Sequence, residues 1–333
     1  MRTINTDLRD TFGRKHDYLR LSITDSCNFR CLYCMPDEPF TCTSSSEQMS
    51  NEEIFEISKV FVERFNINKI RITGGEPLVR NGFSTIIEKL ASLNINIALT
   101  TNGVLLHKYF DLFQKLGIKD LNISIDSLDR SKFKHITKRD QFQNVWNNIT
   151  ESIDRGFNVK LNVVVMRGFN DNEIAAFTAL SHQYPIEVRF IEFMPFSENA
   201  WEKDKVISIA EMLRIISEYH DYYKVQDNVH DTSRKYKIND KSKGFFAFIS
   251  TMSHSFCEGC NRIRLTSDGK MKNCLFGADE FDLLKMFREG KDIENSIQKG
   301  ILKKHKEKGG QFSDLETVCS KELVNRSMIK IGG

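Results

Sequence analysis

Apolar and polar residues follow two different periods along the first two-thirds of the chain. Short runs rich in β-branched residues predict strands, and the stretches between them carry apolar residues at helical spacing. The predicted strands are Tyr18–Thr24, Lys69–Thr73, Asn96–Thr101, Asp120–Ile125, Asn158–Val165 and Ile186–Phe193. Strands that alternate with helices in this way are typical of a parallel sheet covered by helices. Six units are too few for a closed eight-unit barrel, so we expect an α/β fold with an open or partial barrel.

The helices have start signals of their own. Ser50 and Glu53 form a capping box, and apolar residues from Ile54 to Phe65 follow it at helical spacing. Further helices are predicted over Phe83–Leu93, His107–Leu116, Phe142–Arg155, Asn172–Tyr184 and Ile209–Tyr219.

The regular alternation stops after Phe193. Met194–Trp201 is predicted to be a loop, and Lys224–Cys274 contains short strands and turns. We therefore expect a barrel domain over residues 1–195 and a C-terminal α+β extension over residues 196–333. The lysine-rich stretch Lys299–Lys308 is typical of a solvated helix face.

Composition restricts the classes of protein. An apolar fraction of 40% with 28% charged residues is ordinary for a globular chain, and the net charge of +3 is too small for a general nucleic-acid binder. Met1–Arg20 lacks the apolar core of a signal peptide, and no apolar run has the length of a membrane span. These features predict a cytoplasmic protein without membrane or nucleic-acid partners. Because cytoplasmic thiols stay reduced, the eight cysteines require an explanation other than disulfides.

Three cysteines follow the first predicted strand directly. Cys27, Cys31 and Cys34 can converge on one metal centre if the chain curls round it as a loop. A [4Fe–4S] cluster normally takes four cysteines, so three would leave one iron open to a ligand from outside the protein. A structural zinc site is the alternative, but no histidine lies between these cysteines. The nearby Gly74-Gly75-Glu76-Pro77, at the end of the second predicted strand, offers close backbone approach and a carboxylate for an ammonium group.

Three further cysteines lie near the C-terminal end. Cys257, Cys260 and Cys274 could again hold a cluster, or zinc if His254 were a fourth ligand. Arg262 and Arg264 alternate two apart, so on an extended segment both point to one side, where they suit phosphates. The remaining cysteines, Cys42 and Cys319, are interpreted as incidental.

The first cysteine group, with Tyr33 before its last cysteine, resembles the loop of the radical S-adenosylmethionine superfamily. The resemblance implies a partial (β/α)6 TIM-like barrel in which the reduced cluster cleaves S-adenosylmethionine to a 5′-deoxyadenosyl radical. It also implies that S-adenosylmethionine contacts Tyr33, Gly75, Glu76, Ser124, Arg189 and Met194.

The remaining motifs indicate one family within this superfamily. The block from Ser255 to Lys270 with Cys274-Leu275-Phe276, and the terminal Ile331-Gly332-Gly333, are similar to the GTP 3′,8-cyclase family of molybdenum cofactor biosynthesis. Other matching segments are Thr24–Cys31, Arg71–Arg80, Thr100–Gly103, Asn122–Asp126 and Arg189–Pro195. One departure is Ser26, where members commonly carry arginine.

The family resemblance implies the chemistry and its residues. A second open cluster would bind guanine, and the adenosyl radical would take hydrogen from the ribose 3′ carbon, which then joins carbon 8. The implied GTP contacts are Arg20, Arg71, Thr100, Lys160, Arg262, Ile263 and Arg264. The implied catalytic residues are Arg20, Arg262, Arg264, Gly332 and Gly333.

The resemblance further implies a flavodoxin- or ferredoxin-like electron donor, a cyclic pyranopterin monophosphate synthase downstream, and a homodimer. Two alternatives are kept. A peptide-modifying radical enzyme would usually carry more C-terminal cysteines, and a zinc-stabilised nucleic-acid-binding protein would need a basic face with interleaved aromatics.

Overall fold

The computed structural model describes residues 6–35, 42–197, 199, 201–253, 255–312, 318 and 323–332. Twelve of its strands form one sheet in the order β14-β13-β12-β3-β4-β5-β6-β7-β8-β11-β10-β9. The strands of this sheet are β3 Tyr18–Ser22, β4 Lys69–Thr73, β5 Asn96–Thr101, β6 Asp120–Ser124, β7 Asn158–Val165, β8 Glu187–Glu192, β9 Tyr223–Lys224, β10 Arg234–Lys237, β11 Phe245–Ile249, β12 Arg262–Leu265, β13 Lys270–Lys272 and β14 Phe281–Asp282. A separate hairpin pairs β1 Leu8–Arg9 with β2 Lys15–His16.

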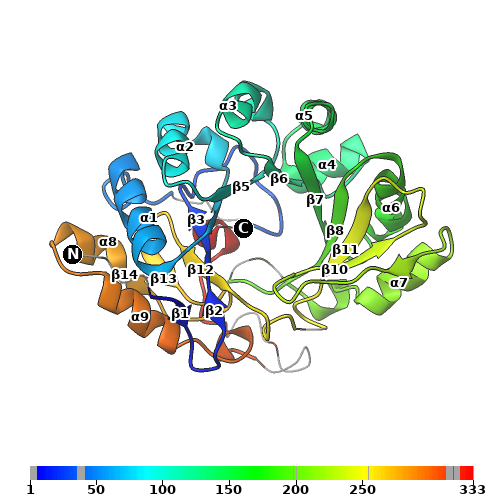
Figure 1. Cartoon of the computed structure of the whole chain (residues 1–333). Helices are drawn as coiled ribbons and strands as arrows, with labels where there is room; N and C mark the ends of the chain where they lie inside the picture. Colours follow the sequence, from blue (N-terminus) through cyan, green and yellow to red (C-terminus); the bar gives the residue numbers. More distant parts are fainter. Residues whose placement is uncertain are drawn as a thin grey trace.

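Neighbouring strands from β3 to β8 run parallel, and helices follow them along the chain. The sheet curves into an open barrel with helices on its outer side (Figure 1). The helices are α1 Asn51–Phe65, α2 Phe83–Ala91, α3 Phe110–Lys115, α4 Arg130–Thr137, α5 Phe142–Asp154, α6 Ile174–Gln183, α7 Ile209–Ser217, α8 Leu283–Arg288, α9 Glu294–Leu302 and α10 Met328–Ile331. The predicted partial barrel is confirmed.

The C-terminal part shares the sheet of the barrel. β11 pairs parallel with β8, and β12 pairs parallel with β3, so two strands from beyond Pro195 extend the parallel block on both sides. The predicted boundary near Pro195 therefore marks a change in topology within one continuous sheet. The boundary itself stays a prediction.

Most predicted elements form where local pattern places them. The capping box at α1 is present: the Ser50 hydroxyl accepts a hydrogen bond from Glu53 N at 3.2 Å, and Ser50 N donates to the Glu53 carboxylate at 2.7 Å. The predicted helix His107–Leu116 is shorter, because a 3-10 turn at Leu106–Lys108 precedes α3. α4 was not predicted; it is capped by Asp129 and buries Phe133 and Ile136.

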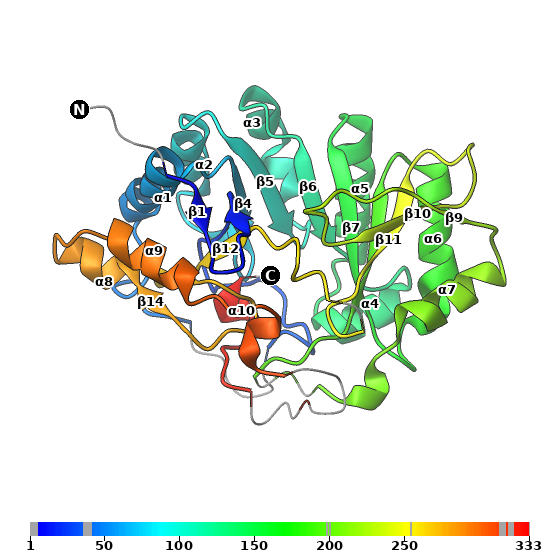
Figure 2. The same ribbon diagram turned by 60° about the horizontal axis from the view of Figure 1, so that its bottom comes forward.

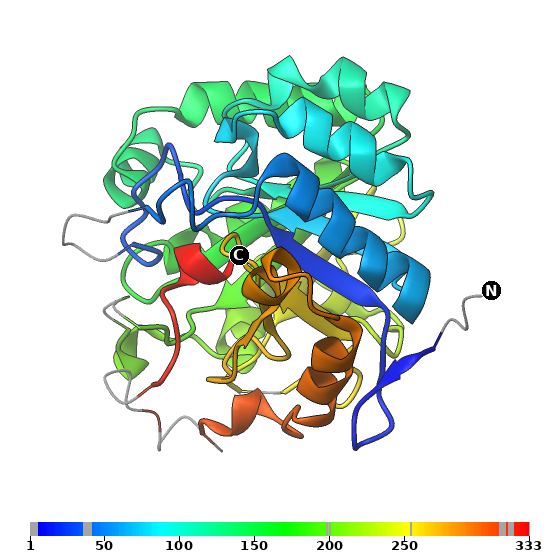
Figure 3. The same cartoon turned by 90° about the vertical axis from the view of Figure 1, so that its left-hand side faces the viewer.

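The core has two parts. A large apolar core lies between sheet and helices, and a smaller one gathers Phe193, Phe196, Trp201, Phe276 and Ile331. Ile331 belongs to α10, which brings the C-terminal end of the described chain beside β3, inside the curve of the sheet (Figures 1 and 3). No helix in the described part is both long and apolar enough to cross a bilayer.

Candidate active site

The first cysteine group lies in the loop that leaves the carboxyl end of β3. Burial and, secondarily, the Glu76 carboxylate raise the pKa of Cys27 to about 11, and burial raises the pKa of Cys34 to about 12. The pKa of Cys31 is raised by burial and by the charges of Asp126, Cys34 and Cys27, so the three sulfurs are neighbours. Burial outweighs the charge of Arg30, which acts to lower the pKa of Cys27. Buried thiols of this kind suit a metal centre, whose positive charge stabilises the thiolates.

This loop is held in place by two parts of the barrel. Arg30 N donates to Thr137 O, and Leu32 N donates to Ile136 O, both at 3.0 Å, so the end of α4 brackets Cys31. The Tyr33 hydroxyl donates to Asp126 Oδ2 at 2.8 Å. Asp126 lies just after β6 and was not predicted as a site residue. Burial raises its pKa to about 6.

The Gly-Gly-Glu-Pro turn after β4 packs directly against the cysteine loop. A Cβ on Gly75 would lie 2.5 Å from Ser26 O, and Glu76 N donates to the same oxygen at 2.8 Å. The Glu76 carboxylate, 1% exposed, accepts hydrogen bonds from Thr101 Oγ1 at 2.8 Å and Asn102 N at 2.6 Å. Glu76 therefore joins two loops of the barrel rim; its predicted contact with S-adenosylmethionine stays a prediction.

The second cysteine group lies at the other end of the strands. Cys257 and Cys260 precede β12, whereas Cys27 follows its parallel neighbour β3. β13 runs back antiparallel to β12, which returns Cys274 to the level of Cys260 and explains the long spacing between them. At about 3.3 Å per residue, the five residues of β3 separate the two groups by roughly 17 Å.

Two cations lie beside Cys260 of this second group. Arg262 and Lys304 lower the pKa of Cys260 to about 5, although burial acts in the opposite direction and is the largest single influence. Lys304 Nζ lies 3.4 Å from Cys260 Sγ, and the backbone N–H of Lys308 donates to Cys257 Sγ at 3.5 Å. The expectation that Lys299–Lys308 is a solvated face is wrong for Lys304 and Lys308, which are 4% and 6% exposed because the chain after α9 turns inward.

Arginines fill the space between the two groups. Arg264, Arg20 and Arg71 are aligned across β12, β3 and β4, and Arg262 precedes them on β12. Burial lowers the pKa of Arg20 to about 10, even though Tyr18 acts against it, and neighbouring arginines lower it further. The pKa of Arg264 is well below its usual value for the same reasons: burial first, then Arg20 and Arg262. Buried cations that repel one another call for an anionic ligand.

Unpaired polar atoms face the same interior. Arg20 Nε, Thr100 Oγ1, Asn122 Oδ1 and Asn162 Oδ1 are buried without a hydrogen-bond partner among the described residues. Buried polar atoms are nearly always bonded, so these four are available to a bound molecule. Asn122 and Asn162 had not been predicted as site residues, although their place two residues from Ser124 and Lys160 on β6 and β7 is a usable signal.

Two predicted contact residues meet on one carboxylate. Glu187 Oε1 accepts from Arg189 Nε at 2.6 Å, and Glu187 Oε2 lies 3.6 Å from Lys160 Nζ. Glu187 is 8% exposed and was not predicted. Ser124 shares its sheet row with Asn162 and Arg189, and Met194 O accepts from Asn199 Nδ2 at 2.8 Å.

The C-terminal end reaches the arginines. Arg264 NH1 donates to Gly332 O at 2.9 Å. Gly332 has φ of +85°, and a Cβ there would lie 2.8 Å from Ser22 Cβ, so only glycine fits. Gly333, His254 and Cys319 lie outside the described residues. Ile263 is buried on β12 between the two arginines.

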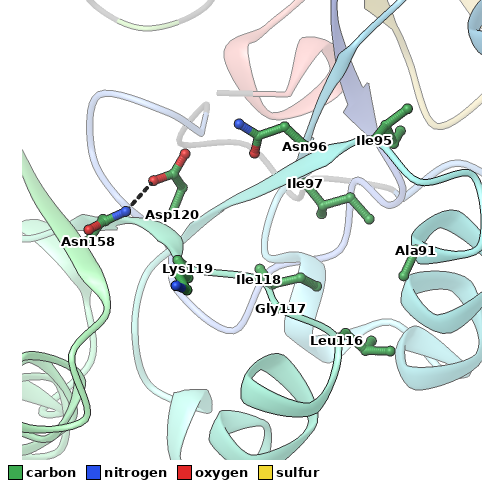
Figure 4. Close-up of a pocket in the computed structure, with 10 residues that line it drawn as sticks. All are labelled: Ala91, Ile95, Asn96, Ile97, Leu116, Gly117, Ile118, Lys119, Asp120 and Asn158. Carbon is green, nitrogen blue, oxygen red and sulfur yellow. Dashed lines mark hydrogen bonds between the residues drawn. The ribbon is translucent and has the colours of Figure 1, made fainter.

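Within the described ranges, no three histidine, cysteine or carboxylate side chains are close enough to hold a single metal ion. A pocket of about 310 Å³ lies at the starts of β5, β6 and β7, where Asn96, Asp120 and Asn158 line it, and no cysteine is among its lining residues (Figure 4).

Comparison with known proteins agrees with this geometry. Residues 21–180 match the radical SAM superfamily, and residues 186–313 match the family described as Molybdenum Cofactor Synthesis C. A crystal structure of Streptococcus suis SuiB shares the fold with a TM-score of 0.58 at 15% identity, covering 83% of this chain and 67% of that one. The family match over residues 21–180, with which the fold agrees, identifies the chain as a radical S-adenosylmethionine enzyme.

Three relatives identify the family. "GTP 3′,8-cyclase, mitochondrial" of Arabidopsis thaliana is 41% identical, covering 98% of this chain and 83% of the relative. "GTP 3′,8-cyclase" of Thermodesulfovibrio yellowstonii is 43% identical over 89% of this chain and 92% of its own. Human "Molybdenum cofactor biosynthesis protein 1" is 40% identical over 97% of this chain, which spans only 51% of that longer protein. The chain belongs to the GTP 3′,8-cyclase family, which uses S-adenosylmethionine and two [4Fe–4S] clusters.

Proposed function

We propose that this chain cyclises GTP to 3′,8-cyclo-7,8-dihydro-GTP, the first step of molybdenum cofactor biosynthesis. The observation that carries the proposal is the row of buried arginines between two cysteine groups at opposite ends of the barrel. A triphosphate is the ligand whose charge relieves their mutual repulsion, and planar guanidinium groups bind phosphate in a bidentate manner.

The position of each residue in the barrel indicates which of the two molecules it would bind. Arg20, Arg71, Arg262 and Arg264, together with Lys160, would hold the triphosphate, and Thr100 and Ile263 would line the nucleotide. Tyr33, Gly75, Glu76, Ser124, Arg189 and Met194 would hold S-adenosylmethionine near the rim where β3 ends. Gly332 and Gly333 would complete the site between them. Fixing ribose against the adenosyl group in this way supplies several kcal/mol through orientation.

The six cysteines Cys27, Cys31, Cys34, Cys257, Cys260 and Cys274 would hold the clusters. When bound, the first cluster supplies the electron that cleaves S-adenosylmethionine, and the second offers an open iron to guanine. The chain itself orients both molecules and keeps water from the reacting carbons, which cofactor enzymes generally require.

Anaerobic incubation with GTP, S-adenosylmethionine and a reductant tests the function. We expect a cyclised nucleotide together with 5′-deoxyadenosine. 5′-Deoxyadenosine formed without any change in GTP would contradict the assigned substrate.

The electron donor is proposed to be a small acidic flavin or iron–sulfur protein that docks at the end of α4. Arg30, Lys134, Lys138 and Arg139 are exposed there, and the backbone of α4 contacts the loop on both sides of Cys31. A basic surface this close to the first cluster suits an acidic carrier, because electrostatic steering changes association rates by about 10- to 1,000-fold.

Charge reversal tests the docking surface. Lys134→Glu with Lys138→Glu and Arg139→Glu should slow reduction by an acidic flavodoxin about tenfold or more at low salt, and should leave reduction by dithionite unchanged. Lys115→Glu with Lys119→Glu is the control, because these exposed lysines lie near the start of β6, at the opposite rim. Equal slowing by both sets would contradict the assignment.

Three predictions concern the wider setting. We propose a homodimer, transfer of the product to cyclic pyranopterin monophosphate synthase, and a cytoplasmic location. Sedimentation of anaerobic protein distinguishes dimer from monomer directly.

A further inference from the structure

The chain that follows α9 wraps the second cysteine group. We call residues 303–310 the wrapping segment. Lys308 N points to Cys257 Sγ, and a Cβ on Gly309 would lie 2.4 Å from Gly277 N, close to Cys274. Arg14 ties the segment to the same group, because its guanidinium donates to Cys257 O at 2.7 Å and to Lys306 O at 2.7 Å.

Lys304 is the member of this segment whose ammonium faces a cysteine. Its Nζ lies 3.4 Å from Cys260 Sγ and donates to Arg262 O at 3.0 Å. The residue is 4% exposed, whereas its neighbours Lys303 and Lys306 are exposed. No carboxylate of the described residues lies within ion-pair distance of it.

A buried ammonium without a carboxylate partner is expensive unless a negative charge lies nearby. The three thiolates of a bound cluster supply such a charge, and hydrogen bonds to cluster sulfurs, like nearby charges, raise or lower its reduction potential. A cation stabilises the reduced form, which carries one more negative charge.

We propose that Lys304 is a positioning residue of the second cluster: its ammonium donates a hydrogen bond to the Cys260 sulfur and raises the reduction potential of that cluster. This role rests on the proposed function, because it requires the second cluster. It adds a residue from outside the cysteine motifs and the GTP contacts.

The test uses the full chain with the first site removed by Cys27→Ser, Cys31→Ser and Cys34→Ser. After anaerobic reconstitution, iron content and an EPR-monitored redox titration then report on the second cluster alone. In this background we expect Lys304→Gln to lower the reduced-to-oxidised ratio about tenfold at any fixed potential, which is 59 mV for one electron. Lys304→Arg should stay near the wild-type potential, because it keeps the charge.

Lys303→Gln is the matched control, since it removes an exposed lysine one residue away. An iron-loaded Lys304→Gln protein with unchanged potential, or an equal shift in the control, would overturn the role. If Lys304→Gln takes up no iron, Lys304→Arg decides: a cluster at the wild-type potential supports the role, and loss of the cluster there contradicts it. Absence of iron in the background protein itself, with Lys304 intact, would instead overturn the second cluster.

Discussion

The two cysteine groups have the same composition, but the charged residues beside their cysteines differ. At the first, burial raises the pKa of Cys27 and Cys34 to about 11 and about 12. The Glu76 and Asp126 carboxylates act in the same direction, and Arg30 acts against them at Cys27. At the second, Arg262 and Lys304 overcome burial and lower the pKa of Cys260 to about 5. Both sites have three cysteines, so the cysteines themselves do not cause this difference in pKa. The residues that the surrounding strands and loops place beside them do.

This difference suits two different tasks. A cluster buried beside the carboxylates of Glu76 and Asp126 resists reduction and is a strong donor once reduced, as cleavage of a sulfonium requires. A cluster among cations belongs with an anionic substrate, and the arginines on β3, β4 and β12 continue the positive region toward the barrel centre. Because the first group follows β3 and the second precedes its parallel neighbour β12, the strands separate the two regions. Figure 2 shows these strands within the open barrel from a second side.

The largest expected effect is loss of the first cluster alone. Cys31→Ser should reduce cleavage of S-adenosylmethionine below detection and halve the iron content, because one of two clusters loses a ligand. The activity assay and iron analysis of anaerobic protein measure both. Cys42→Ser is the control, since Cys42 is exposed and outside both groups; retained cleavage in Cys31→Ser would contradict the first site.

The next effect concerns the positive region. Arg264→Ala should weaken GTP binding by about 1.5–3 kcal/mol, roughly 10- to 150-fold, because it removes charge-assisted hydrogen bonds. Both clusters should remain, as iron analysis would verify. Arg264→Lys keeps the charge and should recover part of the affinity, so an Arg264→Ala protein with normal GTP binding would rule out the phosphate-binding role.

A smaller change should sharpen the contrast at the first group. Asp126→Asn removes a buried negative charge while keeping a side chain that can bond Tyr33, so the potential of the first cluster should rise. Because Asp126 lies far from the second group, the reduction potential of the second cluster should stay unchanged. EPR-monitored titration of both signals measures this, and a shift confined to the second cluster would refute the assignment.

The smallest effect is expected at the contacts of Arg326 with Asp268 and Glu280, which we call the C-terminal clamp. Arg326 donates to Asp268 Oδ1 at 2.8 Å and to Glu280 Oε2 at 2.6 Å, which anchors the chain just before α10. Arg326→Lys should cost about 1–3 kcal/mol of local stability and increase cleavage of the C-terminus by carboxypeptidase.

The clamp has a defined pH dependence. Burial acts to raise the pKa of Asp268, but the hydrogen bonds from Arg326 and Thr266 outweigh burial and lower this pKa below its usual value. The Arg326–Asp268 pair therefore contributes its full stability above the pKa of the unfolded aspartate, near 4. This stability is lost as the pH falls through the lower pKa of folded Asp268. Protease access that is equal in wild type and variant at neutral pH would exclude the clamp.

The sequence predicts those features that depend on residues close together in the chain. β4, β5 and β7 have their predicted bounds, and the capping box starts α1, because alternation and caps act over a few residues. Pairing of β12 with β3 was not predicted, since it joins distant parts of the chain and depends on the whole fold. Lys304 was missed for the same reason: its segment has a solvated composition, and only tertiary packing turns that one side chain inward. Likewise, Glu187 meets Lys160 and Arg189 only once β7 and β8 are paired.

An EPR-monitored redox titration of the anaerobic full chain, with and without GTP, tests the paired sites most directly. Two signals are predicted, with the signal lost in Cys260→Ser titrating at the higher potential and changing when GTP is added. A single signal, or a GTP response confined to the signal that Cys31→Ser removes, would contradict the account.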